Sequence, residues 1–301
     1  MCGLPLVRYQ LALLAAAGVR RAAVNVHHLP AAMAAAAEAS ARALGLALAV
    51  SREPVIAGTG GALREARGLL GGAEAVLVVN GDVLFDVDLG AALAAHRASG
   101  ALATMVLMRM PPGAGYAAVE TDAGGAVRRI AGRFGPGGAG LSPWHFTGVH
   151  VLAPELLARV PAAPFELDVN RHVYPPLMAE GLVRGLVVEG AWDDLGTPGR
   201  YLAANEDVLA GRFPLGRFHG ASPFDGHEPF GHPGVWVGAG AHVERGAALL
   251  APALVGPGAR VEAGATVGPA AVVGARARVR AGARVAHAAA WEGVEVRPGQ
   301  E

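Results

Sequence analysis

Apolar residues follow two different rhythms along the first two-thirds of the chain. Apolar positions at helical spacing predict helices over residues 9–17, 30–44, 61–70 and 89–98. Shorter apolar runs predict strands over residues 22–27, 47–51, 75–80, 101–110 and 182–189. The run AVLVVN at 75–80 is apolar throughout, which is typical of a parallel strand buried on both faces. This alternation predicts a doubly wound α/β sheet, in which ligands bind beyond the carboxyl ends of the strands.

A six-residue period replaces both rhythms near the C-terminus. An aliphatic residue recurs at every sixth position, and alanine stands two positions before all but the first of these sites. The aliphatic sites are Val237, Val243, Leu249, Val255, Val261, Val267, Val273, Val279 and Val285. Because this period is neither 3.6 nor 2, it indicates a solenoid in which each hexapeptide forms one short strand and three strands close a triangular coil. We expect the aliphatic side chains to fill the coil, and the arginines between them, at 276, 278, 280 and 284, to point outward.

Composition indicates where one domain ends and the next begins, and it excludes some classes of binding partner. Residues 212–233 are rich in Gly, Pro, Phe and His, and we interpret them as a linker between an α/β domain over 1–211 and a solenoid over 234–301. The 25 basic residues, all arginine, balance 25 acidic residues, which argues against binding to nucleic acid or to a membrane surface. The only cysteine, Cys2, excludes an internal disulfide and favours the reducing cytoplasm.

Two aspartates stand where the predicted sheet would bind a ligand. Asp82 ends the segment Asn80-Gly81-Asp82 directly after the apolar run, and Asp194 lies in WDDLGTP, after the strand predicted at 182–189. Carboxylates from two strand ends can hold one Mg²⁺ ion, which needs little more than these and phosphate oxygens. Taken alone, each aspartate is better explained as a turn residue or a helix cap, and it is the pair that favours a metal site.

A glycine-rich segment, EPVIAGTGGA at 53–62, opens one of the predicted helices. Glycine lets a flat ligand approach the backbone closely, and the free N–H groups of a helix N-terminus favour anions. The segment matches neither the dinucleotide-binding fingerprint nor the P-loop, so by itself it is a weak indication of a nucleotide site.

The order of these motifs resembles that of the sugar-phosphate nucleotidyltransferases, above all the mannose-1-phosphate guanylyltransferases. The resemblance rests on PLVRYQLALLAAAGV, NVHHLP, EPVIAGTGGAL, VLVVNGDVLFDVDL, FTGVHVLAPELL, WDDLGTPGRYLAANEDVL and the hexapeptides, and it spans essentially the whole chain. It implies a Rossmann-like α/β nucleotidyltransferase domain followed by a left-handed parallel β-helix. The implied reaction joins a sugar 1-phosphate to a nucleoside triphosphate and releases pyrophosphate, with Mg²⁺ as cofactor.

The resemblance also implies roles for individual residues. Catalysis and Mg²⁺ binding would fall to Asp82 and Asp194. The nucleotide would contact Glu53, Gly58, Thr59, Asn80 and Gly81, and the sugar phosphate would contact Arg133, Thr147 and Gly148. Glu53 favours guanine, because a carboxylate accepts hydrogen bonds and guanine offers two adjacent N–H donors. Arg133 stands where the family often has a lysine, and Ala117 where a glycine that contacts the sugar is common.

One departure concerns the beginning of the family pattern. Its members open with a strand, a glycine-rich GxGTRLxPLT loop and a lysine-proline pair that together hold the triphosphate, whereas MCGLPL of this sequence aligns after that segment. The α/β domain is therefore expected to be N-terminally truncated, to lack the central strand of its sheet, and to turn over poorly as residues 1–301.

Two other functions remain open from the sequence. A non-catalytic regulatory subunit would bind the nucleotide-sugar and pair with an active homologue, and a hexapeptide acyltransferase would need a catalytic histidine at a coil boundary. His242 and His287 are the histidines within the repeats, and no loop excursion accompanies them. We expect partners to be the two substrates and either further copies of this chain or a homologous subunit, with no nucleic acid and no membrane.

Overall fold

The computed structural model describes residues 1–113 and 115–300 and divides the chain into two compact units. One, the α/β unit, is Leu13–Trp192; the other, the β-helix unit, combines Met1–Ala12 with Asp193–Glu301. This division differs from the boundary predicted after residue 211, since the segment 193–233 groups with the coils. Among the described residues, no helix is long and apolar enough to cross a membrane.

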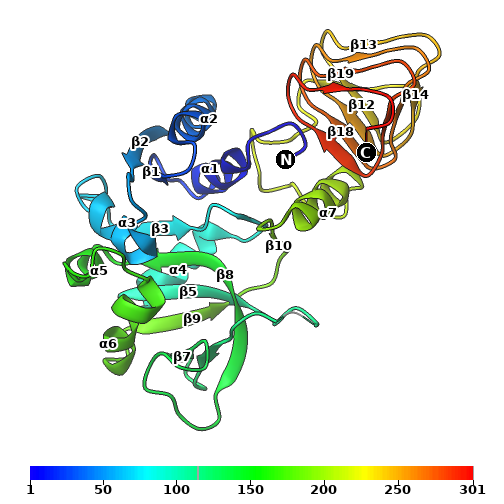
Figure 1. Ribbon diagram of the computed structural model, residues 1–301. Helices are drawn as coiled ribbons and strands as arrows, with labels where there is room; N and C mark the ends of the chain where they lie inside the picture. The colour runs from blue at the N-terminus through cyan, green and yellow to red at the C-terminus, as the bar shows by residue number, and fades with distance from the viewer. Residues whose placement is uncertain (114, 301) are drawn as a thin grey trace. The chain divides into compact units, whose positions relative to one another are not determined.

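The α/β unit contains most of the predicted elements, with ends shifted by a few residues (Figure 1). Its helices are α1 (Leu6–Ala16, which crosses the boundary), α2 (Pro30–Ala43), α3 (Gly58–Ala66), α4 (Leu89–Ser99), α5 (Pro154–Arg159), the π-helix η1 (Val169–Val173) and α6 (Tyr174–Ala179). Its strands are β1 (Arg21–Val26), β2 (Ala47–Arg52), β3 (Val76–Val79), β4 (Val83–Phe85), β5 (Ala103–Met108), β6 (Val119–Thr121), β7 (Val127–Ile130), β8 (Ser142–Leu152), β9 (Val183–Val187) and β10 (Trp192–Asp194, which also crosses the boundary).

The long strand β8 organises a six-stranded mixed sheet. Along one edge β8 pairs antiparallel with β6 and then with β3, and along the other it pairs antiparallel with β5. Strand β9 joins β5 in parallel, and β7 extends the sheet beyond β6. Strands β1 and β2 form a separate parallel pair, against which α2 packs. The single parallel sheet expected from the sequence is therefore not formed, because β1 and β2 stand apart from the mixed sheet.

Strand β3 differs in detail from its sequence prediction. Its partner in the described chain is the antiparallel strand β8, and three of its four residues are only half-buried. Continuous apolar composition was therefore a wrong guide to parallel pairing here. The strand that is buried along its whole length is β5, whose six residues, five of them apolar, are all buried between β8 and β9. Met105, Leu107 and Leu152 form its core together with Tyr174 and Met178 of α6.

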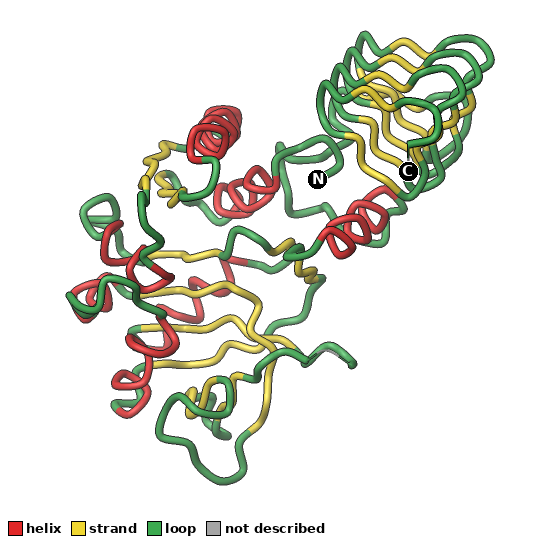
Figure 2. The backbone as a smooth tube through the Cα atoms, viewed as in Figure 1, coloured by secondary structure: helices red, strands yellow, loops and turns green. Residues whose placement is uncertain are grey.

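The β-helix unit confirms the hexapeptide prediction. Its elements are α7 (Pro198–Leu209), β11 (His227–Pro229), β12 (Val235–Gly238), β13 (His242–Val243), β14 (Ala248–Leu249), β15 (Ala253–Val255), β16 (Arg260–Val261), β17 (Thr266–Val267), β18 (Ala271–Val273), β19 (Arg278–Val279), β20 (Arg284–Val285), β21 (Ala288–Ala290) and β22 (Glu295–Val296). Strands pair in parallel with the strand 18 residues further on, as Val243 does with Val261, so three hexapeptides make one coil. The stacked strands are visible in Figure 2.

The coil interior is filled as the period predicted. Val255, Val261 and Val267 are fully buried, and the alanines two positions before them are also buried. A column of glycines, Gly238, Gly256 and Gly274, marks one corner. A Cβ added at Gly256 would lie 2.7 Å from the backbone nitrogen of Ala275 in the next coil, so stacking requires glycine there.

One face of the β-helix is apolar on its outer side and is covered within the same unit. Leu254 is fully buried, although its neighbours Val255 and Ala253 face inward. The segment around Gly3 lies over this face, since a Cβ at Gly3 would be 4.0 Å from Leu254 Cδ2. Tyr9 packs edge-on against Phe218 of the segment 212–233, with ring centroids 5.7 Å apart. That segment is therefore part of the folded unit, and its interpretation as a linker was wrong.

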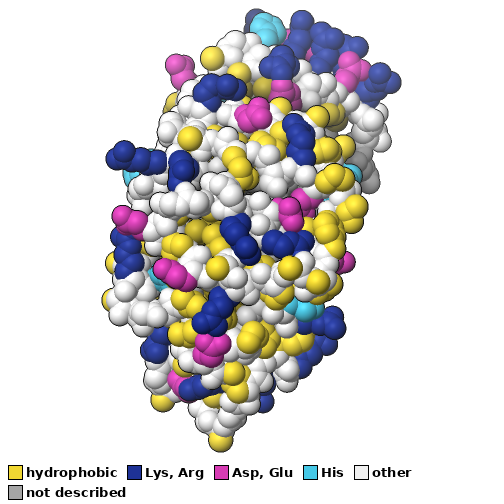
Figure 3. Space-filling view, turned by 90° about the vertical axis from the view of Figure 1, so that its left-hand side faces the viewer, with side chains coloured by type: hydrophobic (Ala, Val, Ile, Leu, Met, Phe, Trp, Pro, Cys, Tyr) yellow, Lys and Arg dark blue, Asp and Glu magenta, His cyan; other side chains and the backbone are white. Residues whose placement is uncertain are grey.

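The outward arginines of the coils form ion pairs with glutamates of adjacent coils. Arg260 lies 2.5 Å from Glu244, and both Arg278 and Arg280 contact Glu262. These bonds lower the pKa values of Glu244 and Glu262. On the face drawn in Figure 3, side chains of both charge signs are likewise interspersed. The outward direction predicted for the repeat arginines is confirmed for Arg278 and Arg280.

Candidate active site

The carboxyl end of β3 meets the middle of β8, and this junction brings together two of the predicted motifs. The Asn80 N–H donates to the Gly148 carbonyl at 2.9 Å. Gly148 has φ +84°, and a Cβ there would lie 3.0 Å from Asn80 Cβ, so the close approach requires glycine. Asp82 follows in the exposed turn between β3 and β4. Asn80, Gly81 and Asp82 thus follow the carboxyl end of β3, where the NGD segment was predicted to lie, and Gly148 of β8 is beside them.

Thr147 serves the scaffold. Its side chain is fully buried, and its hydroxyl donates to the Val106 carbonyl of β5 at 2.8 Å. Its own carbonyl accepts a hydrogen bond from Trp192 Nε1 at 2.9 Å. These contacts hold the Thr147 hydroxyl and carbonyl within the fold, and the sugar contact that the resemblance implied for this residue stays a prediction.

Glu53 lies just beyond β2, where the parallel pair β1–β2 ends. Its N–H continues the ladder by donating to the Val26 carbonyl at 2.9 Å, and its side chain is 8% exposed. One carboxylate oxygen accepts the Ala57 N–H at 3.2 Å, which caps the approach to α3. The other oxygen, Oε1, is buried without a hydrogen-bond partner among the described residues. One oxygen of the carboxylate, Oε2, therefore holds the turn before α3, whereas Oε1 can accept a hydrogen bond from a ligand that reaches it.

The glycine-rich loop before α3 is bound by the segment that leads into η1. The Leu167 carbonyl accepts from the N–H groups of Gly60, at 2.7 Å, and Gly61, at 3.3 Å. A Cβ at Gly58 would lie 2.6 Å from the same carbonyl oxygen. The close backbone approach that the glycines allow is thus to the protein itself. The expectation that these N–H groups are free for an anion was wrong for Gly60 and Gly61. Helix α3 begins three residues earlier than predicted.

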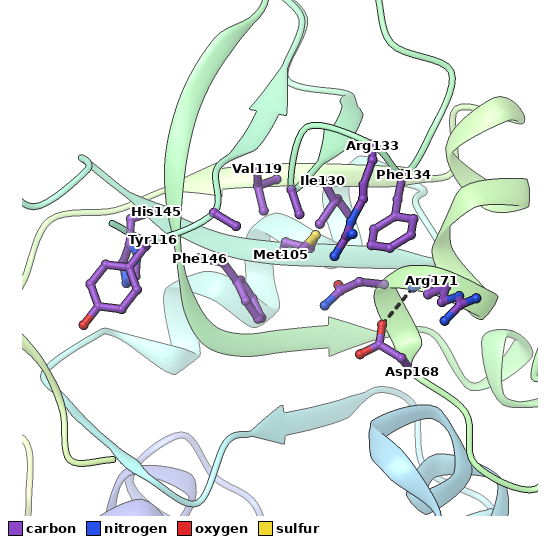
Figure 4. Close-up of a pocket in the computed structure, with 13 residues that line it drawn as sticks. Met105, Tyr116, Val119, Ile130, Arg133, Phe134, His145, Phe146, Asp168 and Arg171 are labelled. Atoms are coloured by element: carbon purple, nitrogen blue, oxygen red, sulfur yellow. Dashed lines mark hydrogen bonds between the residues drawn. The ribbon is translucent and has the colours of Figure 1, made fainter. Parts of the chain in front are cut away.

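A pocket of about 640 Å³ opens beside β8 in the α/β unit (Figure 4). Its wall is formed by Met105, Tyr116, Ala117, Val119, Ile130, Ala131, Arg133, Phe134, His145, Phe146, Asp168, Asn170 and Arg171. Arg133, from the turn after β7, points into it, and its guanidinium lies 5.0 Å from the Phe134 ring centroid. Of the predicted residues, the pocket therefore contains Arg133, and Ala117 lies in the wall as well.

The arginines around this pocket differ in their partners. Arg128 is bound to Asp122 at 2.7 Å, and Arg129 is bound to Glu120, hydrogen bonds that lower the pKa values of both carboxyl groups. Arg133 has no carboxylate partner among the described residues. An unpaired guanidinium in a pocket is suited to a phosphate, which it can bind through two parallel hydrogen bonds.

An aromatic cluster forms the opposite end of the pocket. The buried His145 ring lies 4.7 Å from Tyr116 and 4.2 Å from Trp192, measured between centroids. Sequence reasoning missed these residues and also Asn170. Trp192 belongs to the motif WDDLGTP, but no shared spacing connects it with Tyr116, His145 or Asn170, so only the fold brings these residues together.

Asp194 lies in the β-helix unit, and Asp82 in the α/β unit. Asp194 accepts the Gly196 N–H at 2.8 Å and is paired with Arg200 of α7. Thr197 caps α7 by accepting the Arg200 N–H at 3.3 Å. Among the described residues, no group of three or more metal-ligating side chains occurs. Asp82 is suited to Mg²⁺, because it is an exposed carboxylate at a strand end. Asp194 could bind the ion only after its ion pair with Arg200 is broken.

The Nucleotidyl transferase family model matches residues 1–211. The chain belongs to this family. A mannose-1-phosphate guanylyltransferase from Mycobacterium tuberculosis is 29% identical over 214 residues, which are 70% of this chain and 58% of that protein. An N-acetylmuramate alpha-1-phosphate uridylyltransferase from Caulobacter vibrioides is 33% identical over 208 residues, covering 68% of this chain and 84% of the relative.

The nucleotidyltransferase fold also appears among solved structures. HddC from Yersinia pseudotuberculosis, in a complex with GMP-PN, aligns with a TM-score of 0.54 at 18% identity, over 65% of this chain and 83% of that one. The family assignment and this fold confirm the α/β nucleotidyltransferase architecture expected from the motif order. The chain spans little more than half the length of the guanylyltransferases that it matches.

Proposed function

We propose that this nucleotidyltransferase joins a nucleoside triphosphate, with GTP favoured, to a sugar 1-phosphate, giving a nucleotide-sugar and pyrophosphate. The observation that carries the proposal is the unpaired Arg133 guanidinium inside the pocket beside β8. A dianionic phosphate is the ligand that best complements such a cation. The aromatic end of the pocket, with Tyr116 and His145, suits the apolar face of a sugar ring.

Glu53 supports guanine as the base. Its Oε1 atom is buried and has no partner, so a base N–H that reaches it satisfies a group that the fold leaves unpaired. Guanine has two adjacent donors on its pairing edge, whereas uracil has one donor between two acceptors. The relatives include both guanylyl and uridylyl transferases, so this carboxylate is the feature of the chain that favours GTP.

The reaction is an in-line attack by a phosphate oxygen of the sugar 1-phosphate on the α-phosphorus, with pyrophosphate leaving. In this chain Arg133 binds and orients the attacking phosphate, and its positive charge offsets the repulsion between the two anionic substrates. Asp82 would hold Mg²⁺ in the α/β unit, and the ion would supply neutralisation of the charge on the phosphates when bound. The junction of Asn80 and Gly148 holds the turn that carries Asp82.

The test is a pyrophosphate-release assay with GTP, UTP and dTTP, each with mannose 1-phosphate and N-acetylmuramate 1-phosphate. Arg133→Gln is expected to raise KM for the sugar 1-phosphate about tenfold or more, since a charge-assisted hydrogen bond is lost. Arg159→Gln, which removes only an exposed ion pair with Glu180, is the matched control and should change KM less than twofold. Equal effects of the two substitutions would contradict the proposed phosphate site. Substrate binding without pyrophosphate release would support the non-catalytic subunit that the sequence left open.

A further inference from the structure

One polar side chain of the pocket wall has no role in the fold. The Asn170 amide lines the pocket, and no described residue forms a hydrogen bond with it. Its Oδ1 atom is shielded from water without a partner. An amide left in this state destabilises the protein, and such groups are rare unless a ligand satisfies them. The terminal torsion of asparagine is broad, so a modest rotation can turn either the oxygen or the NH₂ group toward a ligand.

The charges beside Asn170 indicate what that ligand is. Asp168 and Arg171, which flank it in sequence and also line the pocket, have opposite charges, so this part of the wall has no net charge. The guanidinium of Arg133 points into the pocket and has no carboxylate partner among the described residues. An amide both donates and accepts, as a hydroxyl does. A hydroxyl therefore suits Asn170, and the phosphate suits Arg133.

The position of Asn170 is fixed from the glycine-rich loop. The Val169 N–H donates to Thr59 Oγ1 at 3.0 Å, and the Leu167 N–H donates to the Ala57 carbonyl at 2.8 Å. Together with the bonds from Gly60 and Gly61, these hold the start of η1 against the loop. Asn170 is the next residue along the chain. The Thr59 hydroxyl therefore holds the residue that directly precedes Asn170 in the pocket wall.

We propose that Asn170 determines specificity by binding one hydroxyl of the sugar, and that Thr59 is its positioning residue. This inference rests on the proposed function, because it places the sugar 1-phosphate in the same pocket. It adds a residue that the motif order did not indicate. It also links the loop assigned to the nucleotide with the pocket assigned to the sugar, through a hydrogen bond between side chain and backbone.

The experiment measures binding of mannose 1-phosphate and its 2-, 3-, 4- and 6-deoxy analogues by calorimetry, alongside turnover with GTP. The wild-type protein is expected to lose about tenfold in affinity for one analogue more than for the others. Asn170→Ala should weaken binding of mannose 1-phosphate about tenfold and abolish the discrimination against that analogue. Asn170→Ser, which keeps a small polar group, provides the same comparison if the alanine variant does not fold.

The positioning role is tested by a matched pair at residue 59. Thr59→Val removes the acceptor of the Val169 N–H at nearly constant volume and should weaken the sugar phosphate about threefold to tenfold, whereas Thr59→Ser should stay within twofold of wild type. Unchanged discrimination in Asn170→Ala would overturn the inference and leave the proposed function intact. A wild-type protein that neither binds nor turns over mannose 1-phosphate would count against both.

Discussion

The buried pair His150 and Tyr174 predicts a specific loss of stability in acid. His150 of β8 is 5% exposed, and its Nδ1 accepts the Tyr174 hydroxyl at 2.6 Å. Burial lowers the pKa of His150 from 6.5 to about 3, because the charged imidazolium would lose its hydration. The folded state therefore keeps this ring neutral while the unfolded chain binds a proton as the pH falls below about 6.5.

The size of the stability loss follows from the difference between the pKa of His150 in the folded and in the unfolded state. The folded pKa is depressed, so the unfolded state binds more protons between about pH 6.5 and pH 3, and stability falls as the pH is lowered through that window. Going from about pH 7 to about pH 4 should cost about 3 kcal/mol, with a slope of about 1.4 kcal/mol per pH unit in the lower part. His150→Gln retains an acceptor for the tyrosine hydroxyl but does not titrate, so this part of the acid sensitivity should disappear.

Urea unfolding at several pH values checks this prediction, followed by hydrogen–deuterium exchange of a peptide covering residues 142–152, which reports on β8 alone. Tyr174→Phe is the control, since it removes the hydrogen bond and leaves the burial of His150, and it should keep the acid slope. The pKa of His96 is also lowered, mainly by burial and further by the nearby charge of Arg97. Because His96 is present in every variant, its contribution to the acid slope cancels when the variants are compared. Equal slopes for the wild type and His150→Gln would refute the reasoning.

Two further substitutions test separate parts of the molecule. Glu53→Gln should reduce the preference for GTP over UTP about tenfold or more, measured as the ratio of kcat/KM, because the carboxylate acceptor for guanine is lost; an unchanged ratio would remove Glu53 from base recognition. Gly256→Ala should destabilise the β-helix by about 1–3 kcal/mol in thermal unfolding, since the new Cβ would lie 2.7 Å from the Ala275 nitrogen, whereas Gly216→Ala, with nothing within 4 Å, should melt close to wild type.

The repeats could be predicted because their pattern is local and redundant. Each inward valine repeats the same constraint, so the 18-residue coil follows from a period of six without any long-range information. The position of Asn80 and Asp82 at the carboxyl end of β3 was also predictable, because the apolar run before them marks a strand that ends there. By contrast, the hydrogen bonds from the loop glycines to Leu167 join segments more than 100 residues apart, and glycine composition alone fits a ligand and a protein backbone equally well.

The pocket could be predicted only in part, for the same physical reason. Arg133 was identified through the motif order, but Tyr116, His145 and Asn170 come from the irregular segment before β6, a long strand and a π-helix, with no shared spacing. The packing of Tyr9 on Phe218 was likewise hidden, since an aromatic residue in the apolar helix α1 gives no sign of a partner so distant in sequence.

The coil register constrains how this part of the chain can change in length during evolution. Each coil contacts only its neighbours, so the gain or loss of 18 residues would leave every strand with an equivalent partner and keep the glycine column aligned. Deleting a single residue in the middle would instead turn every later inward valine to the outside. A shorter step is accommodated only between β18 and β21 and between β19 and β22, where Ala271 pairs with Ala288 and Arg278 with Glu295, 17 residues apart. Insertions and deletions that survive selection should therefore come in whole coils, or fall at that one turn of the solenoid.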